Sequence, residues 1–269
     1  MFSLFLKTIR KNIFGLAVYT LISAAFVWMY VAFYPSLAKE SEILKKSFEA
    51  LPKEFFQAFD IEIGTYFSSL EGFLSGEYFS IIWPIVLIIL TIAYASTSIA
   101  GEVEKGTIEL LLAQPISRLK IFLAKYFSGI VIIAAFVLLS NFSAVPFAAL
   151  HNVDYQLQNY LTMSIIGFLF GFAIFGICTL LSSLSSTKGR PAAITGGVLI
   201  IMYALNIFSA FQESIDNLKF ASFFHYYDFK EAIVNNSIDI TNVSLFLAVG
   251  IITTVAATVV FIKRDISTT

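Results

Sequence analysis

Charged residues divide the chain into long apolar stretches separated by polar segments. Six stretches lack Asp, Glu, Lys and Arg: 12–38, 78–101, 126–153, 155–187, 191–212 and 240–262. Each exceeds the roughly 20 apolar residues that a helix needs to cross the hydrocarbon core of a bilayer. Backbone groups in lipid must be satisfied within the segment, which favours helices here over barrel strands. We therefore predict an all-α membrane protein with six transmembrane helices, over about 13–34, 79–100, 126–149, 161–184, 192–211 and 243–262.

The composition agrees with this class. Hydrophobic residues make up 58% of the chain and charged residues 13%, about half the roughly 25% usual in soluble domains. The net charge of −1 gives no field that would favour nucleic acid. The single cysteine, Cys178, excludes a disulfide within the chain. We expect one transmembrane domain over 1–269, with the lipid bilayer as a partner and no nucleic acid.

Basic residues predict the orientation of the six helices. With the N-terminus inside, the inner segments hold 11 basic and four acidic residues, and the outer segments hold six basic and 14 acidic residues. Every inner loop then follows the positive-inside bias. We predict a multi-pass protein of the plasma membrane with both termini in the cytoplasm. Before the first span, Phe2, Phe5, Leu6 and Ile9 share one helical face, which predicts a short amphipathic interfacial helix.

Two long outer segments connect the spans. The outer loop 39–77 carries Phe48, Leu51, Phe55 and Phe59 at helical spacing. The outer segment 213–239 contains an aromatic cluster that includes Phe223, Phe224, His225, Tyr226 and Tyr227. In it, Asp228 and Glu231 fit a capping pair at a helix start. The cluster fits either an interfacial aromatic belt, which sequence physics alone favours, or an outer gate.

Several kinds of chemistry are missing from the sequence. There is no P-loop motif for binding ATP, no Cys or His spacing typical of a metal site, and no evident nucleophile set. The spans lack the ionisable groups that proton-driven transporters commonly use. Lys125 stands at a helix end, where snorkelling is the default interpretation. Gly167 and Gly171 form a Gly-x-x-x-Gly pair that predicts close helix packing. We expect no catalytic residue, metal or cofactor on this chain.

The first inner loop carries an amphipathic pattern. On one helix over 102–113, Glu102, Lys105, Gly106 and Glu109 share a narrow face, and apolar residues fill the wide remainder. Pro115 ends this element, and Ser117 is positioned to cap the next helix. A short helix joined rigidly to two spans could bind a cytoplasmic partner and transmit its movement to those spans. The same pattern fits a mere interfacial anchor.

A family resemblance favours the helix that binds a partner over the interfacial anchor. The run Glu102-x-Glu104-x-Gly106-Thr107-x-x-Leu110-Leu111-x-x-Gln114-Pro115-Ile116-Ser117-Arg118 resembles the motif E-x-E-x-G-T-x-E-x-L-L-x-x-P-[IV]-S-R. That motif follows the second span in bacterial ABC exporter permeases of the second type. Residues 71–80, 224–228 and 261–266 resemble three weaker motifs of the same family. With the six spans, these four motifs cover nearly the whole chain.

The resemblance implies a permease subunit that pairs with two copies of a separate ATP-binding subunit, which would hold ATP and Mg. Residues 102–113 would be the coupling helix, with Glu102, Glu104, Lys105, Gly106, Thr107 and Glu109 as ATPase-coupling residues. A second permease chain, identical or paralogous, would complete the path. Residues 213–239 would form short re-entrant helices at the exit. The cargo would be amphipathic or hydrophobic, such as a peptide, an antibiotic or a lipid.

Two other functions remain open on the sequence. The first is a secondary transporter or channel that works without ATP. The second is a membrane scaffold that holds a cytoplasmic protein and transports nothing. Flux with the purified chain alone would favour the first, and partner binding without cargo-dependent ATPase stimulation would favour the second.

Overall fold

The computed structural model describes residues 1–40, 63–211 and 213–265, and these residues form helices and connecting turns with no strand among them. Five helical segments are long and apolar enough to cross a membrane. They are α1 (Phe2–Lys39), α9 (Arg118–Phe142) continued by α10 (Ala144–Leu150), α11 (Leu157–Leu184), α12 (Gly189–Phe211) and α15 (Ile240–Lys263). The predicted all-α, multi-spanning class is therefore confirmed. The residues Phe48, Leu51, Phe55 and Phe59 lie outside the described part of the chain.

The second predicted span is bent. After α4 (Ile63–Tyr66), the chain forms α5 (Leu70–Leu74), a π-helical turn, η1 (Ser75–Phe79), and then α6 (Ile82–Ser98). Ser69 caps α5 by accepting a hydrogen bond from the Gly72 backbone N–H at 3.0 Å. The pair Leu70–Phe79 and α6 bends by 49° and would make a sixth span if counted as one. The apolar run that begins at 78 therefore belongs to an element that starts earlier, among polar residues.

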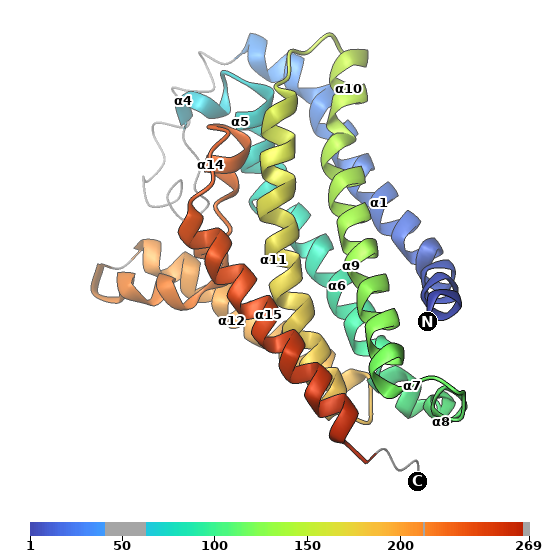
Figure 1. Ribbon diagram of the computed structural model, residues 1–269. Coiled ribbons are helices and arrows are strands. Elements are labelled where there is room, and N and C mark those ends of the chain that lie inside the picture. The colour runs from blue at the N-terminus through green and yellow to red at the C-terminus, as the bar shows by residue number, and fades with distance from the viewer. Residues whose placement is uncertain (41–62, 212, 266–269) are drawn as a thin grey trace.

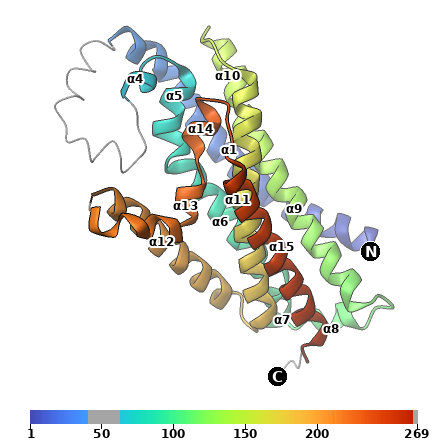
Figure 2. The same ribbon diagram turned by 60° about the vertical axis from the view of Figure 1, so that its left-hand side comes forward.

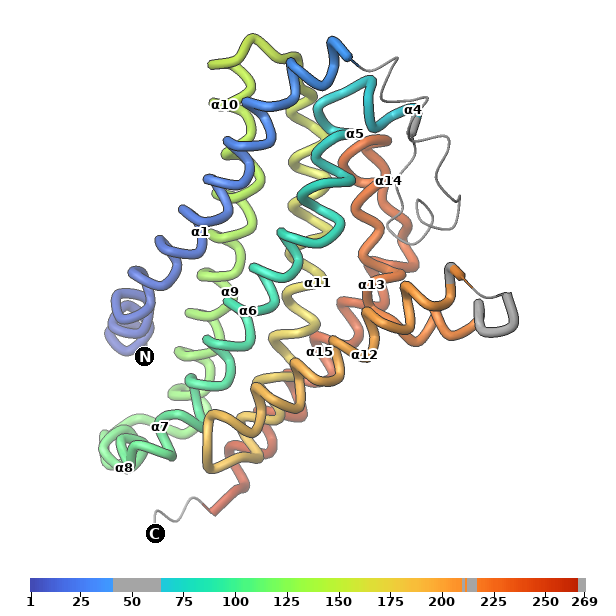
Figure 3. The backbone as a smooth tube through the Cα atoms, turned by 180° about the vertical axis from the view of Figure 1, so that it is seen from behind, coloured from blue at the N-terminus to red at the C-terminus, as the bar shows by residue number. Residues whose placement is uncertain are grey.

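The helix α11 lies at the centre of the bundle. It packs against α15, α6, α9 and α12, and α1 packs against α9 and α10 (Figure 1). Large aromatic side chains, including Trp83, Phe136 and Phe170, are buried where these helices meet. In contrast, α12 diverges from the bundle toward one side, as the view from behind shows (Figure 3).

The N-terminal prediction needs correction. A separate interfacial helix before the first span is wrong, because residues 2–39 form one continuous helix. Its first turns nevertheless leave the line of the remainder (Figure 2). These turns lie along the N-terminal half of α9, since the Ser128 hydroxyl donates to the Phe5 carbonyl at 3.3 Å. The C-terminus lies at the same end, because Arg118 donates to the Arg264 carbonyl at 2.6 Å.

The predicted single helix over 102–113 is also wrong. The structure has α7 (Ala100–Glu104) and α8 (Thr107–Leu112), separated at Lys105 and Gly106. Gly106 has φ +68°, in the left-handed region that other residues disfavour and that a continuing α-helix excludes. The predicted cap of α9 is confirmed, since the Ser117 hydroxyl accepts from the Lys120 N–H.

The outer segment 213–239 folds into three short pieces. They are the 3₁₀ helix η2 (Glu213–Ala221), α13 (Phe223–Tyr226) and α14 (Phe229–Ile233). The predicted cap at Asp228 is confirmed, because its carboxylate accepts from the Glu231 N–H at 3.3 Å. The short helix α14 packs against α11 and α5, so this segment returns to the bundle before α15 begins.

Candidate functional site

A buried ion pair joins three helices at the end of the bundle that carries both termini. Glu102 of α7 accepts from the Lys125 ammonium of α9 at 2.9 Å and lies 3.5 Å from Lys11 of α1. The Thr107 hydroxyl donates to the same carboxylate. The Lys125 side chain is 6% exposed and that of Glu102 is 15% exposed. The snorkelling prediction for Lys125 is therefore wrong, because its ammonium points inward to a partner.

The charges in this cluster change the acidity of Glu102. Burial alone would raise the pKa of this carboxyl, because it penalises the charged form. Lys125, the hydrogen bond from Thr107 and the charge of Lys11 outweigh burial and lower the pKa to about 2. Glu102 is therefore a carboxylate at neutral pH and holds α7 against α9.

Two further contacts fasten α7 to the centre of the bundle. The Glu104 carboxylate accepts from the Lys188 backbone N–H, in the loop between α11 and α12, at 2.7 Å. At the break between α6 and α7, the Ser182 hydroxyl of α11 accepts from Ala100 N–H at 3.0 Å and donates to Ser96 C=O at 3.2 Å. Ser182 thus satisfies backbone groups that the break removes from the helical ladder.

The helix α8 has one anchored face and one exposed face. Ile108 is fully buried, whereas Leu110 is 71% exposed and Glu109 is exposed beside it. Lys105, at the junction with α7, is exposed as well. The six predicted coupling residues therefore divide into three groups. Glu102 and Thr107 bond to each other inside the protein, Gly106 forms the turn, and the other three reach the surface.

Sequence reasoning missed the role of two arginines at this end. Arg264 donates to the carbonyls of Ser183 and Ser185 at 2.8 and 2.9 Å and to the Ser186 hydroxyl at 2.8 Å. It therefore caps the C-terminal end of α11. Arg118 in turn donates to the Arg264 carbonyl. The motif over 261–266 drew attention to Arg264, but the sequence does not reveal which groups this arginine bonds.

The aromatic residues of 223–227 pack inward to different depths. Tyr227 is buried and stacks on Trp83 and Phe170, with ring centroids 6.1 and 4.8 Å apart. Phe224 contacts Tyr203 and Phe170, and Phe223 contacts Phe246. His225 lies against Phe220 and Tyr226. A belt residue would face the lipid interface, so the belt interpretation is wrong for Tyr227.

The Gly-x-x-x-Gly pair on α11 faces α6. A methyl group at Gly167 would collide with the indole ring of Trp83, and one at Gly171 would lie 3.3 Å from Leu87. The Trp83 indole N–H donates to the Ser140 hydroxyl of α9 at 2.9 Å. The missing side chain at Gly167 therefore leaves the space into which the tryptophan fits.

Ionisable groups are buried near both ends of the bundle. Besides Lys125, Glu71 of α5 is buried, and it accepts from the Gln156 N–H at 2.7 Å. Glu71 belongs to the bent pair of helices, which places an acid in an element that we predicted to begin only after it. Within the described residues, no three His, Cys, Asp or Glu side chains gather as a metal site would require.

Comparison with known protein families identifies the family of this chain. The model of a protein family described as "ABC-2 family transporter protein" matches residues 3–266. No curated protein matches the chain. The match includes every element described above, from the first turns of α1 to the Arg264 cap.

Proposed function

The chain belongs to the ABC-2 family of transporter proteins, and from this membership we propose that it is the permease subunit of an ATP-driven exporter. ATP and Mg are bound by two copies of a separate ATP-binding subunit, and hydrolysis occurs there. A second permease chain, identical or paralogous, completes the translocation path. The cargo is an amphipathic or hydrophobic molecule that moves out of the cytoplasm.

The proposed topology has six spans in the plasma membrane, with both termini in the cytoplasm. Three observations support it. The bent pair of Leu70–Phe79 and α6 makes a sixth span if it is counted as one. Arg118, the first residue of α9, contacts Arg264, and Ser128 in the N-terminal half of α9 contacts Phe5. The inner segments so defined carry 11 basic and four acidic residues, as the positive-inside bias requires.

The proposed coupling element is the pair α7 and α8. This proposal rests on the difference between α7, which is bonded to the bundle, and α8, which is exposed. Glu102 and Glu104 tie α7 to α9, to α1 and to the loop after α11, whereas α8 presents the exposed Leu110. A partner that displaces α8 would therefore displace α7 and, through its bonds, several spans at once.

The outer gate is a second part of the proposal. Tyr227 stacks on Trp83 of α6, and α6 leads directly into α7. A displacement of α6 would thus reach the segment 223–227 through this aromatic contact. Gly167 belongs to the same contact, because it leaves room for Trp83 on α11.

The direct test changes the exposed face of α8 without touching the ion pair. In Leu110→Glu, a charge replaces an apolar side chain that is 71% exposed, so folding should be unaffected. We expect copurification of the ATP-binding subunit to fall at least tenfold and export to fall with it. The matched control is Leu150→Glu, which alters a leucine that is 73% exposed at the opposite end.

The test also separates the alternatives. An ATP-independent transporter would keep its flux in Leu110→Glu, and it would show that flux with the purified chain alone. A scaffold would lose its partner in the same variant but would show no cargo-dependent change in ATPase rate beforehand. Equal losses in Leu110→Glu and Leu150→Glu would contradict the coupling role of α8.

A further inference from the structure

A basic cavity of about 230 Å³ lies between α1, α7 and the start of α9. Four lysines line it: Lys11, Lys105, Lys125 and Lys188. Glu102 is the one acid in the lining. The lysines come from four different parts of the chain, so the sequence gives no sign that they meet.

The cavity carries an excess of positive charge. The Glu102 carboxylate is bonded to Lys125 and also lies near Lys11. Just outside the lining, the Glu104 carboxylate is bonded to the Lys188 backbone N–H. Two negative charges therefore face four positive charges. Within the described residues, no ion pair involves Lys105 or Lys188. Like charges around one small space repel each other, and an anion bound between them would offset that repulsion.

Most neutral donors of the lining are already engaged, although the Asn12 amide keeps a second N–H. Thr8 donates to the Leu4 carbonyl, and Asn12 donates to the Thr8 carbonyl. The hydroxyls of Thr97 and Ser98 donate to carbonyls of their own helix. The lysine ammonium groups are therefore the main donors, and ammonium groups commonly bind phosphate as point charges.

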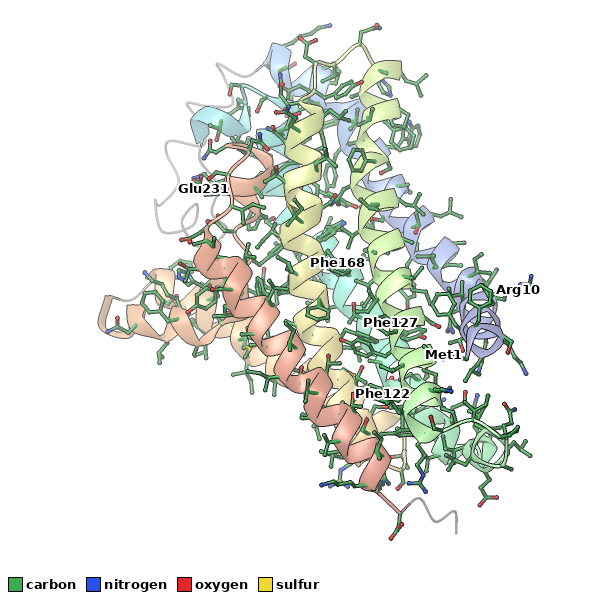
Figure 4. All side chains as sticks on the ribbon, in the orientation of Figure 1. Met1, Arg10, Phe122, Phe127, Phe168 and Glu231 are labelled. Carbon is green, nitrogen blue, oxygen red and sulfur yellow. The ribbon has the colours of Figure 1, made fainter. Side chains whose placement is uncertain are left out.

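The surroundings of the cavity suit a lipid. On α1, directly after Lys11 and Asn12, Ile13 and Phe14 are 56% and 78% exposed. Arg10 projects away from the bundle on the same turns (Figure 4). A headgroup in the cavity would therefore have apolar helix surface beside it for its acyl chains.

We propose that this cavity binds the phosphate group of an anionic ligand, supplied by an acidic phospholipid or by free phosphate. Placing the lipid in the inner leaflet rests on the orientation proposed above. The binding itself does not, because it can be measured on the solubilised chain. Since Lys11 would then be shared between phosphate and Glu102, the bound group would contact the same cluster that holds α7.

The test counts lipids bound to the full chain by native mass spectrometry in a neutral detergent. Phosphatidylglycerol is titrated against phosphatidylcholine, using the native chain and two charge-matched variants. One variant is Lys11→Gln/Lys105→Gln/Lys188→Gln, which changes the cavity. The other is Lys7→Gln/Lys120→Gln/Lys263→Gln, which changes three exposed lysines outside the lining.

We expect the first phosphatidylglycerol to bind the native chain more tightly than phosphatidylcholine does. Each lysine near an anionic lipid contributes about a fivefold factor in affinity, so the cavity variant should bind at least tenfold more weakly. The control variant should stay within about twofold of the native chain. A parallel titration with inorganic phosphate identifies the source. Competition at millimolar phosphate indicates free phosphate, and none indicates the lipid.

Two results would overturn the proposal. The first is an equal loss of phosphatidylglycerol in both variants, which would indicate a general charge effect. The second is unchanged lipid binding in the cavity variant together with lost copurification of the ATP-binding subunit, which would assign the lysines to that partner. Unfolding temperatures measured without lipid check that both variants fold. Failure of the Leu110→Glu test leaves these readouts unaffected.

Discussion

At the scale of single residues, the pairing of Glu102 with Lys125 governs the end of the bundle that carries both termini. Neither charge could remain there alone, since an unpaired buried charge is costly in a low-dielectric surrounding. Both side chains are largely buried, and Lys11 adds a second positive charge nearby. The sequence marked Glu102 as a surface contact for a partner. In the structure, Glu102 is instead bonded to Lys125 inside the protein.

Removing both partners should therefore cost less than the sum of the two single removals. We expect Lys125→Met and Glu102→Gln each to lower the free energy of unfolding by about 3 kcal/mol, as for other broken buried pairs. The double variant should cost less than the sum of the two, with a coupling of about 1–3 kcal/mol. Denaturant unfolding of all four proteins in detergent measures this. Strict additivity would show that the pair contributes nothing.

The low pKa of Glu102 predicts a pH dependence of stability. Its pKa is about 2 in the folded protein, against an ordinary value of 4.5 for a glutamate. Because folding lowers the pKa, the contribution of the carboxylate is complete above about pH 4.5 and disappears as the pH falls toward 2. Unfolding temperatures of the native chain should therefore fall across this window, and less steeply in Glu102→Gln. Parallel slopes in the two proteins would exclude Glu102 as the source.

At the scale of elements, the turn at Gly106 sets the direction of α8. Its φ of +68° suits glycine, and a side chain there would meet no atom within 4 Å. A substitution therefore tests the backbone alone. We expect Gly106→Ala to destabilise the protein by about 1–2 kcal/mol and to weaken export. The control is Gly189→Ala, where space is equally open and φ is not positive. Equal effects at both glycines would contradict this explanation.

The break between α6 and α7 depends on a single hydroxyl. In Ser182→Ala, the Ala100 N–H and the Ser96 carbonyl both lose their partner. We expect a loss of about 1–3 kcal/mol in the free energy of unfolding. The matched variant is Ser183→Ala, since Ser183 is also buried but its hydroxyl donates within its own helix, to Thr179. An equal loss in Ser183→Ala and Ser182→Ala would mean that the destabilisation comes from α11 itself and not from the lost bonds to α6 and α7.

These elements show what the sequence could and could not predict. Apolar length predicted the long helices, and local chemistry predicted the caps at Ser117 and Asp228, because each depends on residues close in sequence. The break at Gly106 was missed because a helical face was assumed to continue through glycine. The partners of Lys125 and Glu104 lie 23 and 84 residues away, so only the packing of α9 and α11 brings them together.

At the scale of the whole molecule, charge and packing divide the bundle into two unlike ends. One end holds the ion pair, the Arg264 cap and both termini. The other end holds Glu71 bonded to the loop before α11. Between them, α11 contacts most of the other long helices. A movement imposed on α7 therefore has a short route to α11 through Ser182, and from α11 to the aromatic segment at Tyr227.

This division predicts which surfaces face the cytoplasm, and the chain is well suited to the measurement. Its one cysteine, Cys178, is buried and should not react with a membrane-impermeant maleimide. Leu110 and Leu150 are both highly exposed, and the segment Arg118–Leu150 lies between them. In intact cells we expect Leu150→Cys to be labelled and Leu110→Cys to be silent, with the pattern reversed in inverted vesicles. Labelling of both from one side would mean that Arg118–Leu150 does not cross the membrane. Labelling of Leu110→Cys from outside alone would place α8 on the outer side of the membrane. A cytoplasmic ATPase could then not contact α8, and the proposed coupling role would fail.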